Sequence, residues 1–166
     1  MSSDQQPLEA LAQIVLNNLE NQHDWTETKV HSQANLPRQL IYGLPPNRLY
    51  VHPDEQIEII KAEKDLEKPI LQVPEFEWVL PLHLAEKWSL AEFAAVFDAI
   101  DAVPPPAQDP ASESGSAADV AGEQQQQQKL WKVPKRGKRL LLATVQNDST
   151  VTYYWMHDGL VKPRQN

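Results

Sequence analysis

Residues 139–156 read RLLLATVQNDSTVTYYWM, and this stretch carries the strongest fold signal in the chain. The apolar run at 139–146 predicts a buried strand, and Asn147, Asp148 and Ser149 are typical turn residues. Residues 151–156 then carry apolar or aromatic side chains on both faces of a second strand. The stretch therefore predicts a hairpin whose second strand lies inside a sheet, or at an edge that another chain covers.

The chain before this hairpin predicts helices and further strands. Apolar residues recur at steps of three or four over residues 8–19, which predicts a helix, and Ser89 with Glu92 forms a capping-box pattern before another. The second helix should end near Val103 because three prolines follow. A further helix is expected over residues 53–64, and strands are expected over 26–31, 40–42, 49–51 and 76–81. This order predicts an α+β fold, a mixed β-sheet with packed helices.

Residues 104–129 differ in composition from the rest of the chain. They contain no aromatic residue, and Val120 is their only branched apolar residue. Such a stretch cannot bury enough surface to offset the entropy of ordering it, so we expect a disordered insertion. Residues 130–166 are too few to form a domain of their own, so they should complete the single domain that residues 1–103 begin.

Composition and charge narrow the possible functions. The chain has 166 residues and no cysteine, which excludes disulfide scaffolds and thiolate metal sites, and no apolar run approaches the ~20 residues of a membrane span. The acidic, amide-rich beginning fits no signal peptide. The net charge is −8, yet residues 130–166 carry seven Lys or Arg against two Asp, a local charge of +5.

The basic stretch suggests a possible contact with RNA phosphates through Lys135, Arg136, Lys138 and Arg139. The alternative is that these residues only keep a strand end soluble. No nucleotide-binding, metalloprotease or serine-hydrolase motif is found, and the five histidines have no metal-ligand spacing. We therefore expect no metal and no cofactor.

The C-terminal pattern resembles one known family. An apolar strand ending in Ala-x-Val at 140–145, an Asn-Asp-Ser-Thr turn, a Tyr-Tyr strand and Asp158-Gly159 are similar to the tail of the small non-catalytic (Sen-fifteen type) subunit of the eukaryotic tRNA-splicing endonuclease. Residues 80–100 and 50–61 are similar to the fungal versions of this subunit. The resemblance implies a fold like the C-terminal domain of tRNA-splicing endonucleases.

The resemblance also implies partners. It suggests a heterotetramer of two catalytic and two structural subunits, in which this chain binds a catalytic subunit, the one that cuts at the 3′ splice site, and meets pre-tRNA only indirectly. Separately, the stretch KVPKRGKR at 132–139 is similar to a nuclear signal, so we expect a nuclear location, with the cytoplasmic face of an organelle as the alternative. The isolated chain could pair with itself. Val151, Tyr153, Tyr154 and Trp155 would form the partner interface, and Asp148 would dock into a basic groove on the opposite dimer. Periodicity does not decide which face of residues 151–156 meets the partner.

Catalysis is not expected from this chain. Catalytic subunits of the family cleave RNA without a metal, using a Tyr, a His and a Lys as base, acid and cation. Here only the basic position around Lys138 and Arg139 matches that pattern. Two alternatives remain: an autonomous ribonuclease of the same fold using Tyr50, His52 and Lys138, and a generic interaction adaptor whose hairpin is merely core.

Overall fold

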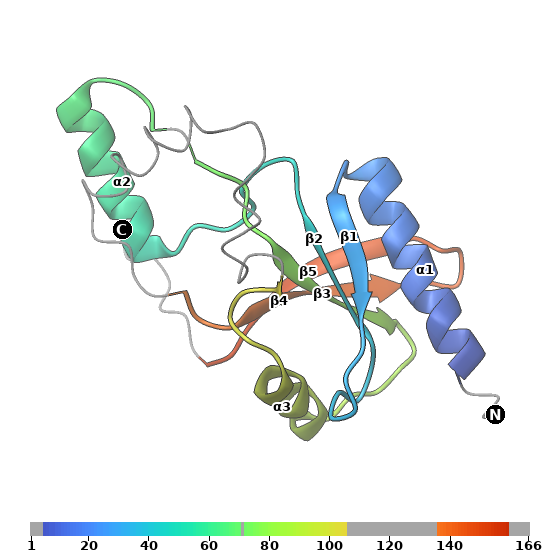
Figure 1. Cartoon of the computed structure of the whole chain (residues 1–166). Coiled ribbons are helices and arrows are strands. Elements are labelled where there is room, and N and C mark those ends of the chain that lie inside the picture. The colour runs from blue at the N-terminus through green and yellow to red at the C-terminus, as the bar shows by residue number, and fades with distance from the viewer. Residues whose placement is uncertain (1–4, 71, 106–135, 160–166) are drawn as a thin grey trace.

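The computed structural model describes residues 5–70, 72–105 and 136–159 and contains one five-stranded sheet with three helices (Figure 1). The strand order is β1-β2-β3-β4-β5, with β3 and β4 parallel and the other neighbours antiparallel. The elements are α1 (Gln5–Gln22), β1 (Thr26–His31), β2 (Leu40–Leu44), α2 (Pro53–Leu66), β3 (Glu77–His83), α3 (Leu90–Ala99), β4 (Arg139–Val145) and β5 (Val151–His157). The predicted α+β class with a mixed sheet is confirmed.

The two faces of the sheet have separate hydrophobic cores. On one face, α1 packs Val15 and Leu19 against residues such as Val79 and Ala143. The core on the other face joins residues of α3, β2, β3 and β4, and it includes Val96, Phe97, Trp78, Leu80 and Leu140. Because neighbouring residues of the central strands point to opposite cores, both faces of these strands must be apolar, and their sequences form continuous apolar runs.

The predicted beginnings of α2 and α3 are confirmed by hydrogen bonds, whereas α3 ends at Ala99, earlier than the predicted end near Val103. In α3 the Ser89 hydroxyl accepts from the Glu92 amide at 3.3 Å, and the Ser89 amide donates to the Glu92 carboxylate at 2.6 Å. In α2 the His52 Nδ1 accepts from the Asp54 amide at 3.2 Å. These contacts satisfy backbone amides that have no partner within the helix.

Residues 49–51 do not form the predicted strand. The preceding strand β2 continues through Gly43 and Leu44, and the chain then runs in non-strand conformation to the beginning of α2. Gly43 is therefore a strand residue and not part of a turn. A Cβ at this position would lie 2.8 Å from the Thr28 Cγ2 and 3.0 Å from the Trp25 Cε3, so the close approach of β1 leaves no room for a side chain.

Strand β3 begins one residue later than predicted and continues two residues beyond Pro81. The proline is tolerated because β2 pairs with β3 only as far as Val79. The Pro81 carbonyl accepts from the Arg38 Nη1 at 3.3 Å. The nitrogen of Pro81 faces the same side as its carbonyl, the side where β2 no longer pairs with β3. The missing amide hydrogen of proline therefore costs the sheet no hydrogen bond.

The predicted hairpin is confirmed as β4 and β5, which pair antiparallel over their full length. Parallel pairing with β3 places β4 inside the sheet, so residues that follow the predicted insertion complete the sheet that begins with β1. Apart from Pro104 and Pro105, residues 104–129 lie outside the described residues. No helix in the described part of the chain is both long and apolar enough to cross a membrane.

Candidate partner interface at the edge strand

Strand β5 lies at one edge of the sheet and carries no acidic or lysine side chain. It pairs with β4, and within the described residues no strand lies on its other side. The opposite edge strand, β1, is protected differently: it contains charged residues, and its register shifts between Thr26 and Lys29, where Glu27 has a φ of 52°. Charges and bulges discourage strand addition, so β5 is the edge that fits pairing with another chain.

Both faces of β5 contact cores of the protein, and Met156 packs against the core that contains α3. Val151, Tyr153 and Trp155 are half-buried and pack against the core that contains α1. The Tyr153 hydroxyl donates to the Asn18 Oδ1 at 2.6 Å, and burial raises the pKa of Tyr153. Tyr154 points to the other face and is 56% exposed. Among the proposed interface residues in this strand, Tyr154 is therefore the most exposed to solvent.

An apolar hollow lies beside β5 on the α1 side. It has a volume of about 270 Å³, and it lies between the C-terminal end of α1, the segment before α2 and the last two strands. Its lining is formed by Leu19, His23, Trp25, Leu49, Leu141, Tyr153 and Trp155. Leu49 is 44% exposed although it borders this apolar surface. The hollow could receive an apolar side chain from a strand added to the edge.

Asp148 lies in the exposed turn between β4 and β5. Its Oδ1 accepts from the Thr150 amide at 3.0 Å, and this hydrogen bond is the main reason why the pKa of Asp148 lies below its ordinary value. In the same turn, the Asn147 Oδ1 lies 2.9 Å from the His83 Nε2. Turn geometry is thus a sufficient reason for an aspartate here, and the carboxylate is exposed, as the predicted docking into a basic groove requires.

The basic residues before β4 have partners within the protein. Arg139 is buried, and its guanidinium bonds Glu77 at 2.6 and 3.1 Å and Glu75 at 2.8 Å. Arg136 bonds the Glu77 carboxylate at 3.1 Å and the Phe76 carbonyl at 3.0 Å. Burial alone would lower the pKa of Arg139, but its hydrogen bonds with Glu77 and Glu75 raise it. Both guanidinium groups therefore neutralise internal carboxylates.

The two other predicted phosphate contacts are placed differently. The Lys138 Nζ donates to the Phe97 carbonyl at 2.7 Å, and Lys135 lies outside the described residues. The basic stretch is thus not a row of free cations: at least three of its members hold the beginning of β4 to β3 and α3. This arrangement weakens the case for a direct contact with RNA.

The candidate nuclease residues each contact a different part of the protein. The Tyr50 ring lies 4.9 Å from the His157 ring and 4.8 Å from the Arg139 guanidinium carbon. Burial raises the pKa of Tyr50, and its hydroxyl has no hydrogen-bond partner among the described residues. His52 caps α2, while Lys138 bonds α3. Within the described ranges, no three acidic or histidine side chains are grouped to hold a metal ion.

Sequence reasoning missed the carboxylates of this site. Glu77 is 1% exposed at the beginning of the apolar strand β3, and burial raises its pKa although Arg139 and Arg136 oppose this effect. Arg48 extends the network by bonding Glu55 at 2.8 and 2.9 Å. The sequence did contain a signal for this network, because Glu77 is an acidic residue within the otherwise apolar stretch FEWVL at 76–80. A charge buried in such a strand requires a partner of opposite charge.

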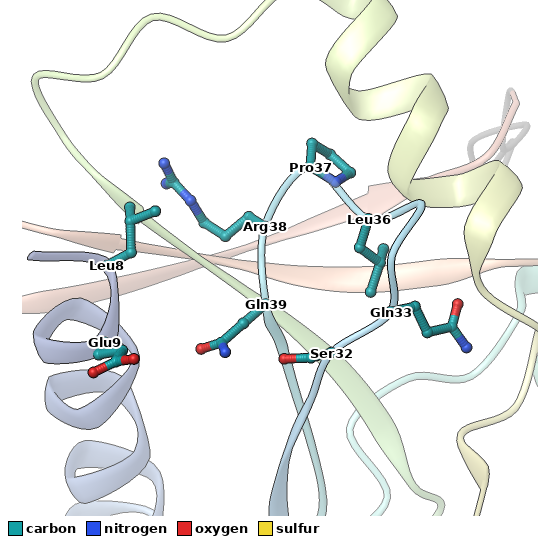
Figure 2. Close-up of a pocket in the computed structure, with 8 residues that line it drawn as sticks. All are labelled: Leu8, Glu9, Ser32, Gln33, Leu36, Pro37, Arg38 and Gln39. Atoms are coloured by element: carbon teal, nitrogen blue, oxygen red, sulfur yellow. The ribbon is translucent and has the colours of Figure 1, made fainter. Parts of the chain in front are cut away.

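A second hollow, of about 240 Å³, lies between the beginning of α1 and the loop that joins β1 to β2 (Figure 2). Polar residues that line it include Glu9, Ser32 and Gln39. Arg38 also lines it, but its guanidinium bonds the Glu86 carboxylate and the Pro81 carbonyl and stacks on Trp88 at 5.1 Å. Because its cation is already neutralised, we assign no anion-binding role to this hollow.

The edge strand and the turn belong to a stretch that matches a known family. The model of the Sen15 protein family matches residues 14–113 and 116–166. The chain belongs to the Sen15 family. A probable tRNA-splicing endonuclease subunit, tsp-1, from Neurospora crassa is 67% identical over 166 residues, which cover all of this chain and 70% of that relative. The family resemblance expected from residues 140–159 is thus confirmed for this Sen15-family chain.

Proposed function

We propose that this Sen15-family chain is a non-catalytic subunit of a tRNA-splicing endonuclease and that β5 joins it to a catalytic subunit. Family membership and the name of the Neurospora relative support the endonuclease role. The observation that supports the place of contact is an edge strand without acidic or lysine side chains, with Tyr154 56% exposed. Strand addition at this edge would pair its free backbone groups, and aromatic side chains would supply much of the affinity.

The candidate ribonuclease residues support a structural role over an enzymatic one. Tyr50 is packed between Trp155, His157 and Arg139, so its buried hydroxyl is poorly placed to accept a proton from RNA. His52 already uses its Nδ1 as a helix cap. General acid–base cleavage of RNA needs a base at the attacking 2′-hydroxyl and an acid at the leaving oxygen, on either side of one phosphate, whereas Tyr50, His52 and Lys138 each have a different internal partner.

The experiment that tests this function is co-purification with the catalytic subunits, followed by mass measurement of the complex. We expect a stable complex with the full chain and none with a chain truncated after Ser149, which lacks β5. The purified full chain alone, offered pre-tRNA with EDTA present, should not cleave it. Cleavage that survives repurification would refute the non-catalytic role, while failure to form any complex would favour a generic adaptor.

Two neighbouring tyrosines provide a matched pair of variants. Tyr153→Ala should lower the stability of the lone subunit by about 2–3 kcal/mol, since the half-buried ring and its bond to Asn18 are lost. Tyr154→Ala should leave the lone subunit folded and weaken association by about 2 kcal/mol. Thermal unfolding and titration with the catalytic subunit separate the two effects. If both variants unfold and neither changes association, the interface lies elsewhere.

A further inference from the structure

Helix α2 stands away from the sheet, at the far side of the molecule from α1 (Figure 1). Its buried side packs on a small cluster of its own, in which Ile59 and Ala62 contact Ile70 and Val51. The cluster draws only on α2 and the segments that flank it, and not on the two cores of the sheet. The described part of the chain therefore gives α2 little packing outside its own neighbourhood.

Ion pairs nevertheless fix the position of α2. Glu55, in the first turn of the helix, is 5% exposed and is held by the Arg48 guanidinium at 2.8 and 2.9 Å. Arg48 also lies 3.8 Å from Glu75, which bonds Arg139 at the beginning of β4. A buried bidentate pair is favourable only in a defined geometry. A series of ion pairs thus links the first turn of α2 to the beginning of β4, although the helix does not pack on the sheet.

The outer face of α2 combines exposed apolar and basic side chains. Ile57 is 41% and Ile60 is 45% exposed, and they are neighbours one turn apart. Lys61 and Lys64 follow at helical spacing on the same side, opposite the buried Glu55, Ile59 and Ala62. Within the described residues, Lys61 pairs with Glu58 at 3.7 Å, and both side chains are open to solvent. In a chain with a net charge of −8, this face thus places two lysines beside two exposed isoleucines, with Glu58 and Asp65 at its margin.

We propose that this α2 outer face (Ile57, Ile60, Lys61 and Lys64) binds an acidic amphipathic segment of another subunit of the endonuclease. The inference rests on the proposed function and adds a second contact remote from β5. Two adjacent isoleucines fit the apolar stripe of such a segment, and the lysines complement its carboxylates. RNA would use the lysines but would leave the isoleucines exposed, so the combination favours a protein partner.

Site-specific photo-crosslinking in the assembled complex tests the identity of the partner. A photoreactive phenylalanine analogue is placed at Ile57 or Ile60 of the full chain, and the control position is Leu90, which is 86% exposed on α3. We expect positions 57 and 60, but not 90, to link to a segment of another subunit with more Asp and Glu than Lys and Arg. Crosslinks to pre-tRNA, to a basic segment or to this chain itself would overturn the inference, as would none above the control.

Surface variants test the energetic contribution. Ile57→Ser combined with Ile60→Ser should weaken assembly about tenfold or more, and Lys61→Glu combined with Lys64→Glu should do so most strongly at low salt. Leu90→Ser is the matched control, and none of the variants should change the Tm of the lone subunit appreciably. If both double variants assemble as tightly as the wild type, the α2 contact is refuted, but the proposed function is not. A wild-type chain that never assembles would refute the proposed function as well.

Discussion

Replacing Arg139 by methionine should destabilise the subunit by about 3–4 kcal/mol. The substitution removes the ion pairs to Glu77 and Glu75 and leaves the Glu77 carboxylate, which is 1% exposed, with Arg136 as its remaining cation. Breaking a buried pair from one side costs about 3–5 kcal/mol, and Arg136 keeps the expected value near the lower limit.

The aromatic contacts of Arg139 add to this estimate. Its guanidinium carbon lies 4.8 Å from the Tyr50 ring centroid and 5.7 Å from that of Trp155. Each such contact contributes about 0.5 kcal/mol or more, while methionine retains much of the apolar volume of the stem. For a chain of this size the total corresponds to a Tm lowered by about 6–16 °C.

Urea unfolding followed by tryptophan fluorescence measures this effect. Lys138→Met is a suitable control, because its hydrogen bond to the Phe97 carbonyl should be worth about 1 kcal/mol. Combining Glu77→Leu with Arg139→Met should recover part of the loss, since no uncompensated carboxylate then remains at position 77. An Arg139→Met protein within about 1 kcal/mol of wild type would refute the reasoning. If its stability is unchanged but the salt dependence of pre-tRNA binding by the complex falls by about one unit of log–log slope, Arg139 contacts phosphate instead.

Three further predictions concern the turn, an acid-sensitive ion pair and the insertion. Asp148→Asn keeps the side-chain oxygen that accepts from the Thr150 amide, so the lone subunit should keep its Tm, whereas the heterotetramer that the family resemblance implies should dissociate more readily. Tetramer mass that is unaffected at low salt would contradict the docking role. Hydrogen bonds from Arg38 lower the folded-state pKa of Glu86 below its ordinary 4.5, so its contribution to stability is present above that pH and is lost as pH falls through the lowered value. Glu86→Gln should flatten the pH dependence of the urea midpoint in that acidic range, and identical curves for both proteins would exclude the linkage. Replacing residues 104–129 by a short Gly/Ser linker should change the Tm by only a few degrees, about 2–4 °C per kcal/mol lost, and should permit assembly. A much larger loss would show that the insertion packs on the domain.

Local sequence determined the regular elements of this protein. The alternation and turn residues of 139–156 were sufficient to predict the hairpin, because strand period and turn chemistry act between near neighbours. The capping box at Ser89 and the spacing over residues 8–19 were sufficient for two helices for the same reason. Residues 49–51 were misassigned because a short apolar run carries no information about whether a neighbouring strand is available to pair with it.

The tertiary structure decided which residues form the surface of the candidate interface. Tyr153 faces the core that contains α1, where the Oδ1 of Asn18, 135 residues away in the chain, accepts a hydrogen bond from its hydroxyl, whereas Tyr154 lies on the opposite face and is exposed. The sequence suggests that Arg139 is a free cation, but in the structure it forms a buried ion pair with Glu77, which lies 62 residues away in the chain. Side-chain direction and charge pairing depend on which distant segments the sheet brings together, so periodicity and composition alone could not determine them.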